Sequence, residues 1–275
     1  MIPSTHVTSV LLEAYGRSVP RFVTQFPDQF SSCWELYARG DELQKVERED
    51  FEYEDADIVL WGTAARGTKT YRAVLFLCSL GHGPQATMLN RSLFEDALTA
   101  RWAELNRAEA IRRIDAQEKH NIHLWTETFR NRELDLGVLS DLPPLTENDL
   151  DQLEEDFGPY GTKPWTGHKN LRALVEELDK DWGDQNERGL LDWMHSVHLR
   201  HANLTLHNTA SSVVKPRTEN ERPIYEAAES EDDIAVALLC GFWAYGHLFR
   251  VVLRGEQRQR FEAFYAERMP TFFQR

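Results

Sequence analysis

The sequence predicts an all-α protein, a multi-helix bundle of about ten helices. Apolar residues recur at steps of three and four along most of the chain, and no convincing run alternates apolar and polar residues between two-residue turns. The chain has 275 residues, of which 41% are hydrophobic, which is enough for one sizeable core. Because no clean boundary divides it, we expect a single helical domain over residues 1–275, in which an N-terminal helical extension, residues 1–55, packs on a core of residues 56–275.

Turn and start signals place the individual helices. The string Gly81-His82-Gly83 predicts a helix-helix turn, and Pro84 suits the first turn of the helix that follows it. Residues 134–146 are expected to form a connector, and residues 209–227, which hold two prolines, a long loop. The expected helices span residues 5–19, 28–39, 56–80, 84–106, 108–131, 147–157, 169–181, 187–207, 232–254 and 256–268.

The helix at residues 147–157 is strongly acidic. Thr146 followed by Asp149 resembles a capping box, in which the two side chains satisfy backbone N–H groups at the start of the helix. The many carboxylates of this helix predict a face exposed to water rather than a cation site.

The most apolar stretch, residues 234–253, is about long enough to cross a bilayer. His247 and Arg250 lie inside it, however, and charged groups are costly in a membrane. The acidic residues 231–233 at its start and Gly255 after its end are typical of a helix with both ends in water. We therefore expect a fully buried helix and no membrane contact.

Charge and cysteine content limit the partners and the compartment. The chain carries 31 Lys and Arg against 45 Asp and Glu, a formal charge of −14, so no broad basic face for duplex DNA is expected. Cys33, Cys78 and Cys240 are too scattered for a disulfide framework or a Cys-rich zinc site, and each lies in an apolar string where an inert buried thiol is expected. The first residues lack the basic-then-apolar order of a signal peptide, which favours a cytoplasmic protein.

Two expected helices carry charged residues inside an apolar stripe. In both helices, residues at steps of three and four form a stripe along one face, which is typical of a buried seam. Each seam also holds a tryptophan. The first seam is formed by Met88, Arg91, Glu95, Leu98, Trp102 and Leu105. The second is formed by Leu190, Trp193, Val197, Arg200, Leu204 and His207.

Charged groups in a buried seam need partners, because burying an unpaired guanidinium or carboxylate costs several kcal/mol. Arg91 and Glu95 lie one turn apart and can pair locally. If the two seams face each other, Glu95 can instead meet Arg200, which leaves Arg91 and His207 directed at a shared polar pocket. Two interpretations remain open: a salt-bridge network that fixes helix register, or a catalytic or ligand-binding pocket.

The string SVHLRHANLTLHN, residues 196–208, resembles the Arg, polar residue, short spacer, His motif of the HEPN superfamily. Many members of that superfamily are metal-independent ribonucleases of bacterial toxin or antiphage defence systems. The resemblance implies that Arg200 holds the scissile phosphate of an RNA substrate and His207 acts as general base or acid, roles that suit a fixed guanidinium and an imidazole of near-neutral pKa. It also implies a homodimer, and a site with no cofactor and no metal.

The polar residues around this motif are the expected substrate-binding residues: His201, Asn203 and Asn208. An ideal helix would separate Arg200 from His207 by about 10 Å along its axis, so a shared phosphate requires the helix to be distorted or to end between them. With Glu95 and Arg91 added from the first seam, the candidate catalytic set has four members.

A broader resemblance covers residues 56–254. The strings ATMLNRSLFEDALTARWAEL and SVHLRHANLTLHNTASSVV look like an uncharacterised bacterial helical family of unknown function, which has an Arg-Ser-Leu-x-Glu helix and a later His before small polar residues. Arg91, Glu95 and His207 occupy the matching positions. This resemblance implies no activity, but it selects the residues that the seams select.

Two other functions are considered. His195, His198 and His201 form an H-x-x-H-x-x-H run that could hold zinc or iron, although steps of three rotate the imidazoles around a helix. Alternatively, the protein is a noncatalytic helical binding or regulatory protein whose buried charges are structural and whose acidic surface engages a basic protein partner.

Overall fold

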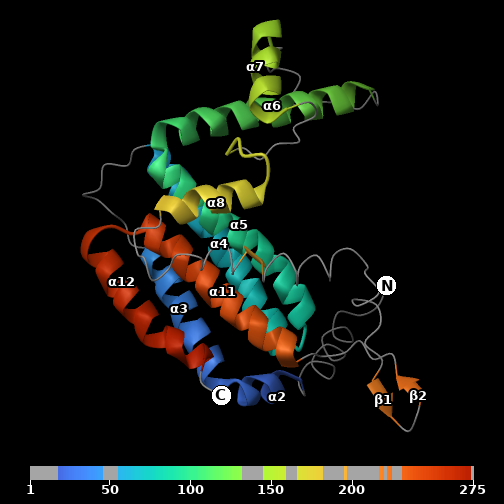
Figure 1. Ribbon diagram of the computed structural model, residues 1–275, viewed down its shortest axis with the longest axis vertical. Coiled ribbons are helices and arrows are strands. Elements are labelled where there is room, and N and C mark those ends of the chain that lie inside the picture. The colour runs from blue at the N-terminus through green and yellow to red at the C-terminus, as the bar shows by residue number, and fades with distance from the viewer. Residues whose placement is uncertain are drawn as a thin grey trace, which may run out of the picture.

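The computed structural model describes residues 18–45, 55–131, 145–158, 166–181, 195–196, 217–219, 222–224 and 231–273. Within these residues the protein is all-α, as the sequence predicts, apart from one short hairpin (Figure 1). The helices are α2 (Ser18–Gln25), α3 (Pro27–Lys45), α4 (Asp55–Ser79), α5 (Gly83–Leu105), α6 (Arg107–Asn131), α7 (Glu147–Phe157), α8 (Leu171–Asp181), α11 (Glu231–Val252), α12 (Gly255–Arg268) and the 3-10 turn η3 (Met269–Phe272).

Most helix bounds agree with the expected ones to within two residues, and α7 has the expected bounds. Helix α3 continues to Lys45, beyond the expected end at residue 39. Helix α2 was not expected, because Pro20 suggests a break, but proline is tolerated in the first turn of a helix and Phe22 anchors α2 in the core. The expected helices at residues 5–19 and 187–207 fall almost entirely outside the described residues.

The expected loop at residues 209–227 contains a hairpin. Strand β1 (Arg217–Glu219) pairs antiparallel with β2 (Arg222–Ile224), so that Arg217 lies opposite Ile224. Each strand has only three residues. Such a strand is too short to show the alternation of apolar and polar residues on which a sequence prediction depends.

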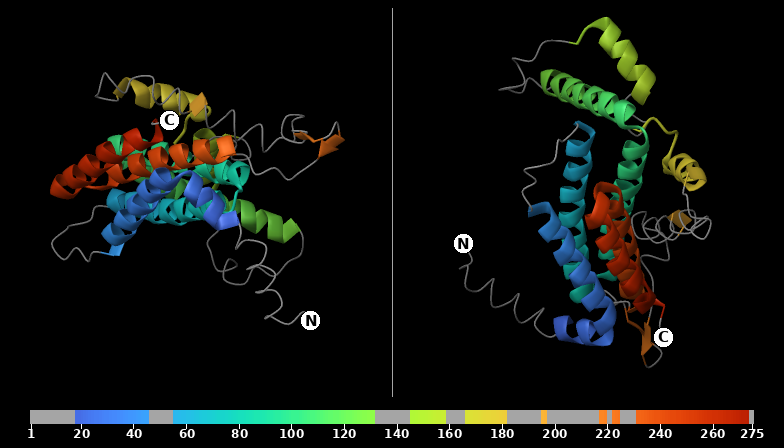
Figure 2. Two further views of the ribbon diagram at one scale, coloured as in Figure 1. Left: turned by 90° about the horizontal axis from the view of Figure 1, so that it is seen from below. Right: turned by 90° about the vertical axis from the view of Figure 1, so that its left-hand side faces the viewer.

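Helix α11 is the centre of the bundle, by which we mean α3, α4, α5, α11 and α12. It packs along α5 and α4 on one side and against α3 and α12 on the other (Figures 1 and 2). Phe242, Trp243, Tyr245 and Phe249 from α11 are almost completely buried. Among the described residues, α11 is the helix long and apolar enough to cross a membrane, but 78% of its apolar stretch is buried inside the fold, as expected for a core helix.

Small residues let α11 approach its neighbours closely. The side chain of Asn90 on α5 donates to the backbone oxygen of Ala237 on α11 over 2.7 Å. A Cβ at Gly241 would come within 2.9 Å of the Asn90 amide oxygen, and one at Gly83 within 2.7 Å of the backbone nitrogen of Ile234. Neither contact leaves room for a side chain, so glycine allows the helices to pack at this distance.

Helices α6 and α7 form an arm outside the bundle. The chain leaves α5 at Asn106, whose side chain and backbone N–H both donate to the Trp102 carbonyl, and α6 then runs across the end of the bundle (Figure 1). Helix α7 packs on α6, and its predicted capping box of Thr146 and Asp149 is present. Helix α8 lies against α5. The arm therefore meets the bundle mainly through the first turns of α6, as the side view in Figure 2 also shows.

Candidate functional site

Arg91 and Glu95 form an ion pair on α5. Nε of Arg91 donates to Oε1 of Glu95 over 3.0 Å, and the two side chains are 34% and 42% exposed. Of the two arrangements expected from the sequence, this is the local one. Because both partners belong to one helix, this ion pair does not by itself fix how α5 packs against a neighbour. It presents a guanidinium and a carboxylate that a solute can reach.

The stripe that holds this pair borders the buried face of α5 instead of forming it. Leu98 and Trp102 are buried as expected, but Met88 is half-buried and Leu105 is exposed. The buried residues in the first part of α5 lie between the expected positions: Ala86, Thr87, Asn90, Leu93, Phe94, Asp96 and Ala97. Of the six seam residues, only Leu98 and Trp102 are therefore buried. Small and apolar residues of α5 occur on most sides of the helix, so steps of three and four do not single out its packed face.

The buried charge of α5 is Asp96, which the sequence analysis missed. Its side chain is 5% exposed and accepts from the guanidinium of Arg66 on α4, with Nε of Arg66 3.2 Å from Oδ2. Burial raises the pKa of Asp96 above its ordinary value, and the hydrogen bond from Arg66 acts in the opposite direction. This pair joins two helices, so the register-setting role expected of a buried ion pair suits Arg66 and Asp96 better than Arg91 and Glu95.

Trp102, in the second half of the stripe, is covered by the segment leading into α8. The imidazole of His168 lies edge-on to the ring of Trp102, with 6.1 Å between ring centroids. His168 is held by Thr166 at 3.0 Å and by Glu177 of α8 at 2.9 Å. Arg91 precedes Trp102 by about three helical turns. At the rise per residue of an α-helix, the two lie roughly 16 Å apart along the axis of α5. Two parts of the stripe thus have different surroundings: Trp102 is packed, whereas Arg91 and Glu95 form a half-buried ion pair.

The other half of the predicted site comes from the string that carries the HEPN-like motif, residues 196–208. The remaining site residues lie outside the described residues: Arg200, His201, Asn203, His207 and Asn208. Of the histidine run, the structure describes His195, which is 4% exposed. The meeting of Arg200 and His207 with the α5 pair therefore stays a prediction.

A second buried imidazole lies on α11. His247 is 4% exposed and packs against Trp243, with 4.0 Å between ring centroids, and edge-on to Tyr265 of α12. Burial, followed by the charges of Arg250 and Arg101, lowers the pKa of His247 well below its ordinary value. A neutral, closely packed imidazole is the result, which suits a core residue.

The three cysteines are the inert thiols that the sequence predicts. All are free and buried. Burial raises the pKa of Cys33 and of Cys240 to about 12, and it raises that of Cys78 as well. Since the thiolate is the nucleophile, none of them is activated for covalent catalysis. In the part of the chain that the structure describes, no three His, Cys, Asp or Glu side chains gather as a metal site would require.

Together these features define an all-α helical bundle with a solvent-accessible arginine-glutamate pair on one of its central helices. The chain belongs to DUF5677, a family of unknown function, whose model matches residues 57–221. This confirms the resemblance to an uncharacterised family, although the match ends before α11 and not at residue 254. Arg91, Glu95, Arg200 and His207 all fall within the matched range. No curated protein and no solved structure matches the chain.

Proposed function

We propose that this protein is a metal-independent ribonuclease of the HEPN-like type, acting in the bacterial cytoplasm as a toxin or in antiphage defence. The observation that carries the proposal is the ion pair of Arg91 and Glu95. It is accessible to solvent and lies within one helix, while the helix-joining role belongs to Arg66 and Asp96. An accessible pair of this kind is better suited to meeting a ligand than to fixing the fold.

In the proposed reaction, RNA supplies its own nucleophile. His207 removes the proton from a ribose 2′-hydroxyl, the 2′-oxygen attacks phosphorus, and the bond to the 5′-oxygen breaks. The products are a 2′,3′-cyclic phosphate and a 5′-hydroxyl, the leaving oxygen taking a proton from solvent or from the protonated imidazole. Arg200 and Arg91 would neutralise the developing phosphorane charge, and Glu95 would orient the Arg91 guanidinium. His201, Asn203 and Asn208 would contact the substrate, and a homodimer would complete the site.

The test is cleavage of labelled RNA by the purified chain in the presence of EDTA. We expect fragments that end in a cyclic phosphate, and a loss of about 100-fold or more for Arg200→Ala and for His207→Ala. Arg91→Ala should lower the rate by far more than its effect on stability explains, because an ion pair one helical turn apart contributes only about 0.3–0.5 kcal/mol.

Helix α8 offers a matched control. Arg172 donates to Glu176 over 2.8 Å in the same one-turn spacing, and both side chains are exposed. Arg172→Ala removes an ion pair of the same residue types and spacing, although a more exposed one, and should leave cleavage unchanged. Absence of cleavage by the wild-type chain on structured and single-stranded RNA, together with a large drop in melting temperature for Arg200→Ala, would favour the noncatalytic scaffold instead.

A further inference from the structure

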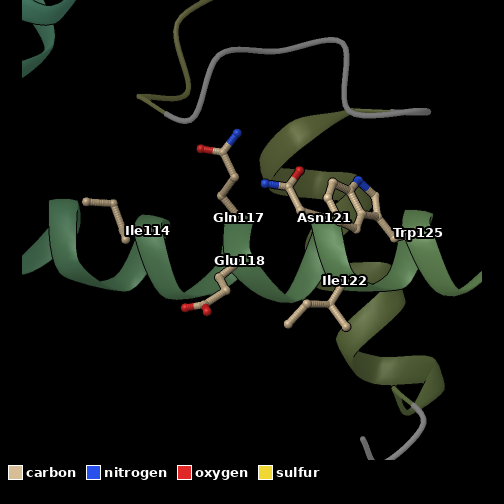
Figure 3. A pocket seen from close by; sticks show the side chains of 6 residues that line it. All are labelled: Ile114, Gln117, Glu118, Asn121, Ile122 and Trp125. Atoms are coloured by element: carbon tan, nitrogen blue, oxygen red, sulfur yellow. The ribbon is translucent and has the colours of Figure 1, made fainter. Parts of the chain in front are cut away.

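The arm carries an exposed apolar face that the bundle does not cover. A groove of about 400 Å³ runs along α6 and is lined by Ile114, Gln117, Glu118, Asn121, Ile122 and Trp125. Figure 3 shows these six side chains along one stretch of α6, with Gln117, Asn121 and Trp125 pointing to the same side. Trp125 is 62% exposed, and the neighbouring Leu124 is also exposed. A tryptophan left this open on a projecting helix is typical of an interaction surface.

Helix α7 occupies a different part of α6. Its Asp156 accepts from Arg112 over 2.8 and 3.0 Å, and its Phe157 stacks on His120 with 5.5 Å between ring centroids. Neither Arg112 nor His120 lines the groove. The ion pair and the ring contact between α6 and α7 therefore involve no groove residue.

The order of the groove residues is self-complementary. In an antiparallel pair of α6 helices centred between Lys119 and His120, Ile114 of one chain lies opposite Trp125 of the other. In the same register Gln117 lies opposite Ile122 and Glu118 opposite Asn121. Ile114 and Trp125 thus meet at both ends, Ile122 can pack on the aliphatic part of Gln117, and at the centre a carboxylate can accept from an amide N–H. A two-fold axis requires this kind of matching, because each residue and its partner must occur on both surfaces.

The charge of α6 also favours a second copy of this chain. Between Arg107 and Asn131 the sequence has five basic and four acidic residues, whereas the whole chain carries a charge of −14. Two copies that meet through α6 avoid most of the repulsion that other contacts between acidic surfaces would entail. A strongly basic partner would find no excess of negative charge here to select this helix.

We propose that the groove on α6 is the contact between two copies of this chain, paired antiparallel about a two-fold axis near residues 119 and 120. The stretch from Ile114 to Trp125 is only about 17 Å long, so the buried area falls below that of a standard interface. We therefore expect a weak dimer with a dissociation constant of roughly 10–100 µM. This contact lies on the arm and not beside Arg91 and Glu95, so it is separate from the homodimer that would complete the proposed ribonuclease site and does not depend on that activity.

The experiment is sedimentation velocity of the full chain over a hundredfold range of concentration. The wild type should dimerise, and more strongly at high salt, because screening reduces the repulsion between two chains of charge −14. Ile114→Lys and Trp125→Glu should each weaken the dimer by about 10-fold or more, since each places a charge against an apolar partner. Ile58→Lys is the matched control, because Ile58 on α4 is also 62% exposed.

The register is tested by combining the two changes. In the antiparallel pair, a chain carrying both Ile114→Lys and Trp125→Glu places opposite charges face to face at both ends, so dimerisation should return. In a parallel pair the same chain would face like charges, and it would stay monomeric. A monomeric wild type at every concentration, a double variant that stays monomeric, or a control that dissociates the dimer as strongly as Trp125→Glu would overturn the proposal.

Discussion

The bundle and the arm are stabilised in different ways. In the bundle, α11 packs its aromatic residues into one continuous apolar core shared with α3, α4, α5 and α12. In the arm, α6 and α7 contact each other through an ion-pair cluster of Arg112, Arg113, Glu109 and Asp156 and through the aromatic pair of His120 and Phe157, and α7 adds only Leu153 and Phe157 as buried apolar side chains outside that core. Hydrophobic burial stabilises the bundle as one unit, whereas the arm has a small apolar contact and depends more on ion pairs that respond to charge and pH.

The largest effect is expected from the bundle. Phe94→Ala removes a fully buried ring that packs against Trp243, 5.7 Å between ring centroids, and it should lower the free energy of unfolding by about 3–5 kcal/mol. Denaturant unfolding measures the loss. The matched control is Phe76→Ala on α4, where the ring is 47% exposed, and the cost should be much smaller. Equal losses for the two variants would contradict a stability based on burial.

An intermediate and local effect is expected in the arm. Asp156→Ala removes the buried carboxylate that Arg112 and Arg113 contact. A hydrogen bond to a charged group contributes about 1.5–3 kcal/mol to the free energy of unfolding, and less where, as for Arg112, solvent screens the charge. Hydrogen exchange should speed up at the amides of α7 but not in α11. Asp151→Ala, an exposed residue of the same helix, serves as control. Faster exchange throughout α11 would show that arm and bundle unfold as one unit.

The same carboxylates should make the arm sensitive to acid. Hydrogen bonds from Arg112 lower the pKa of Asp156, and they help to lower that of Glu109 to about 2. Because these folded-state values lie below the ordinary ones, the stabilisation is present above the ordinary carboxylate pKa and is lost as pH falls through the lowered values.

The smallest effect is expected from protonation of His120, which should lower the stability of the arm at a pH closer to neutral. Burial against Phe157 and the neighbouring charge of His123 lower its pKa below the ordinary value, and no group of the described residues forms a hydrogen bond with its buried Nε2. The folded arm therefore favours the neutral imidazole, so its stability begins to fall as pH drops through the ordinary histidine range near 6.5. An NMR titration of His120 measures this, and His120→Phe should remove the dependence while His123→Phe retains most of it. A pKa at or above the ordinary value would refute the prediction.

The two ion pairs of α5 differ in how well the sequence predicts them. Heptad spacing singled out Arg91 and Glu95 and offered a local pair as one possibility, and the structure contains that pair. It gave no hint of Asp96, which follows Glu95 directly and is nearly buried. Adjacent helical positions differ by about 100° around the axis, so their burial depends on which neighbours pack there.

The sequence by itself determined the helical class, most helix bounds, the buried character of α11, the inert cysteines and the cap at Thr146. These properties depend on neighbours within a few positions of the chain, or on the total apolar surface that folding removes from water. Only the tertiary structure decided which side of α5 faces α4 and α11, that Arg66 and Asp96 join two helices, and that Trp125 stays exposed on the arm. Those outcomes depend on contacts between residues far apart in the chain, which periodicity along a single helix does not encode.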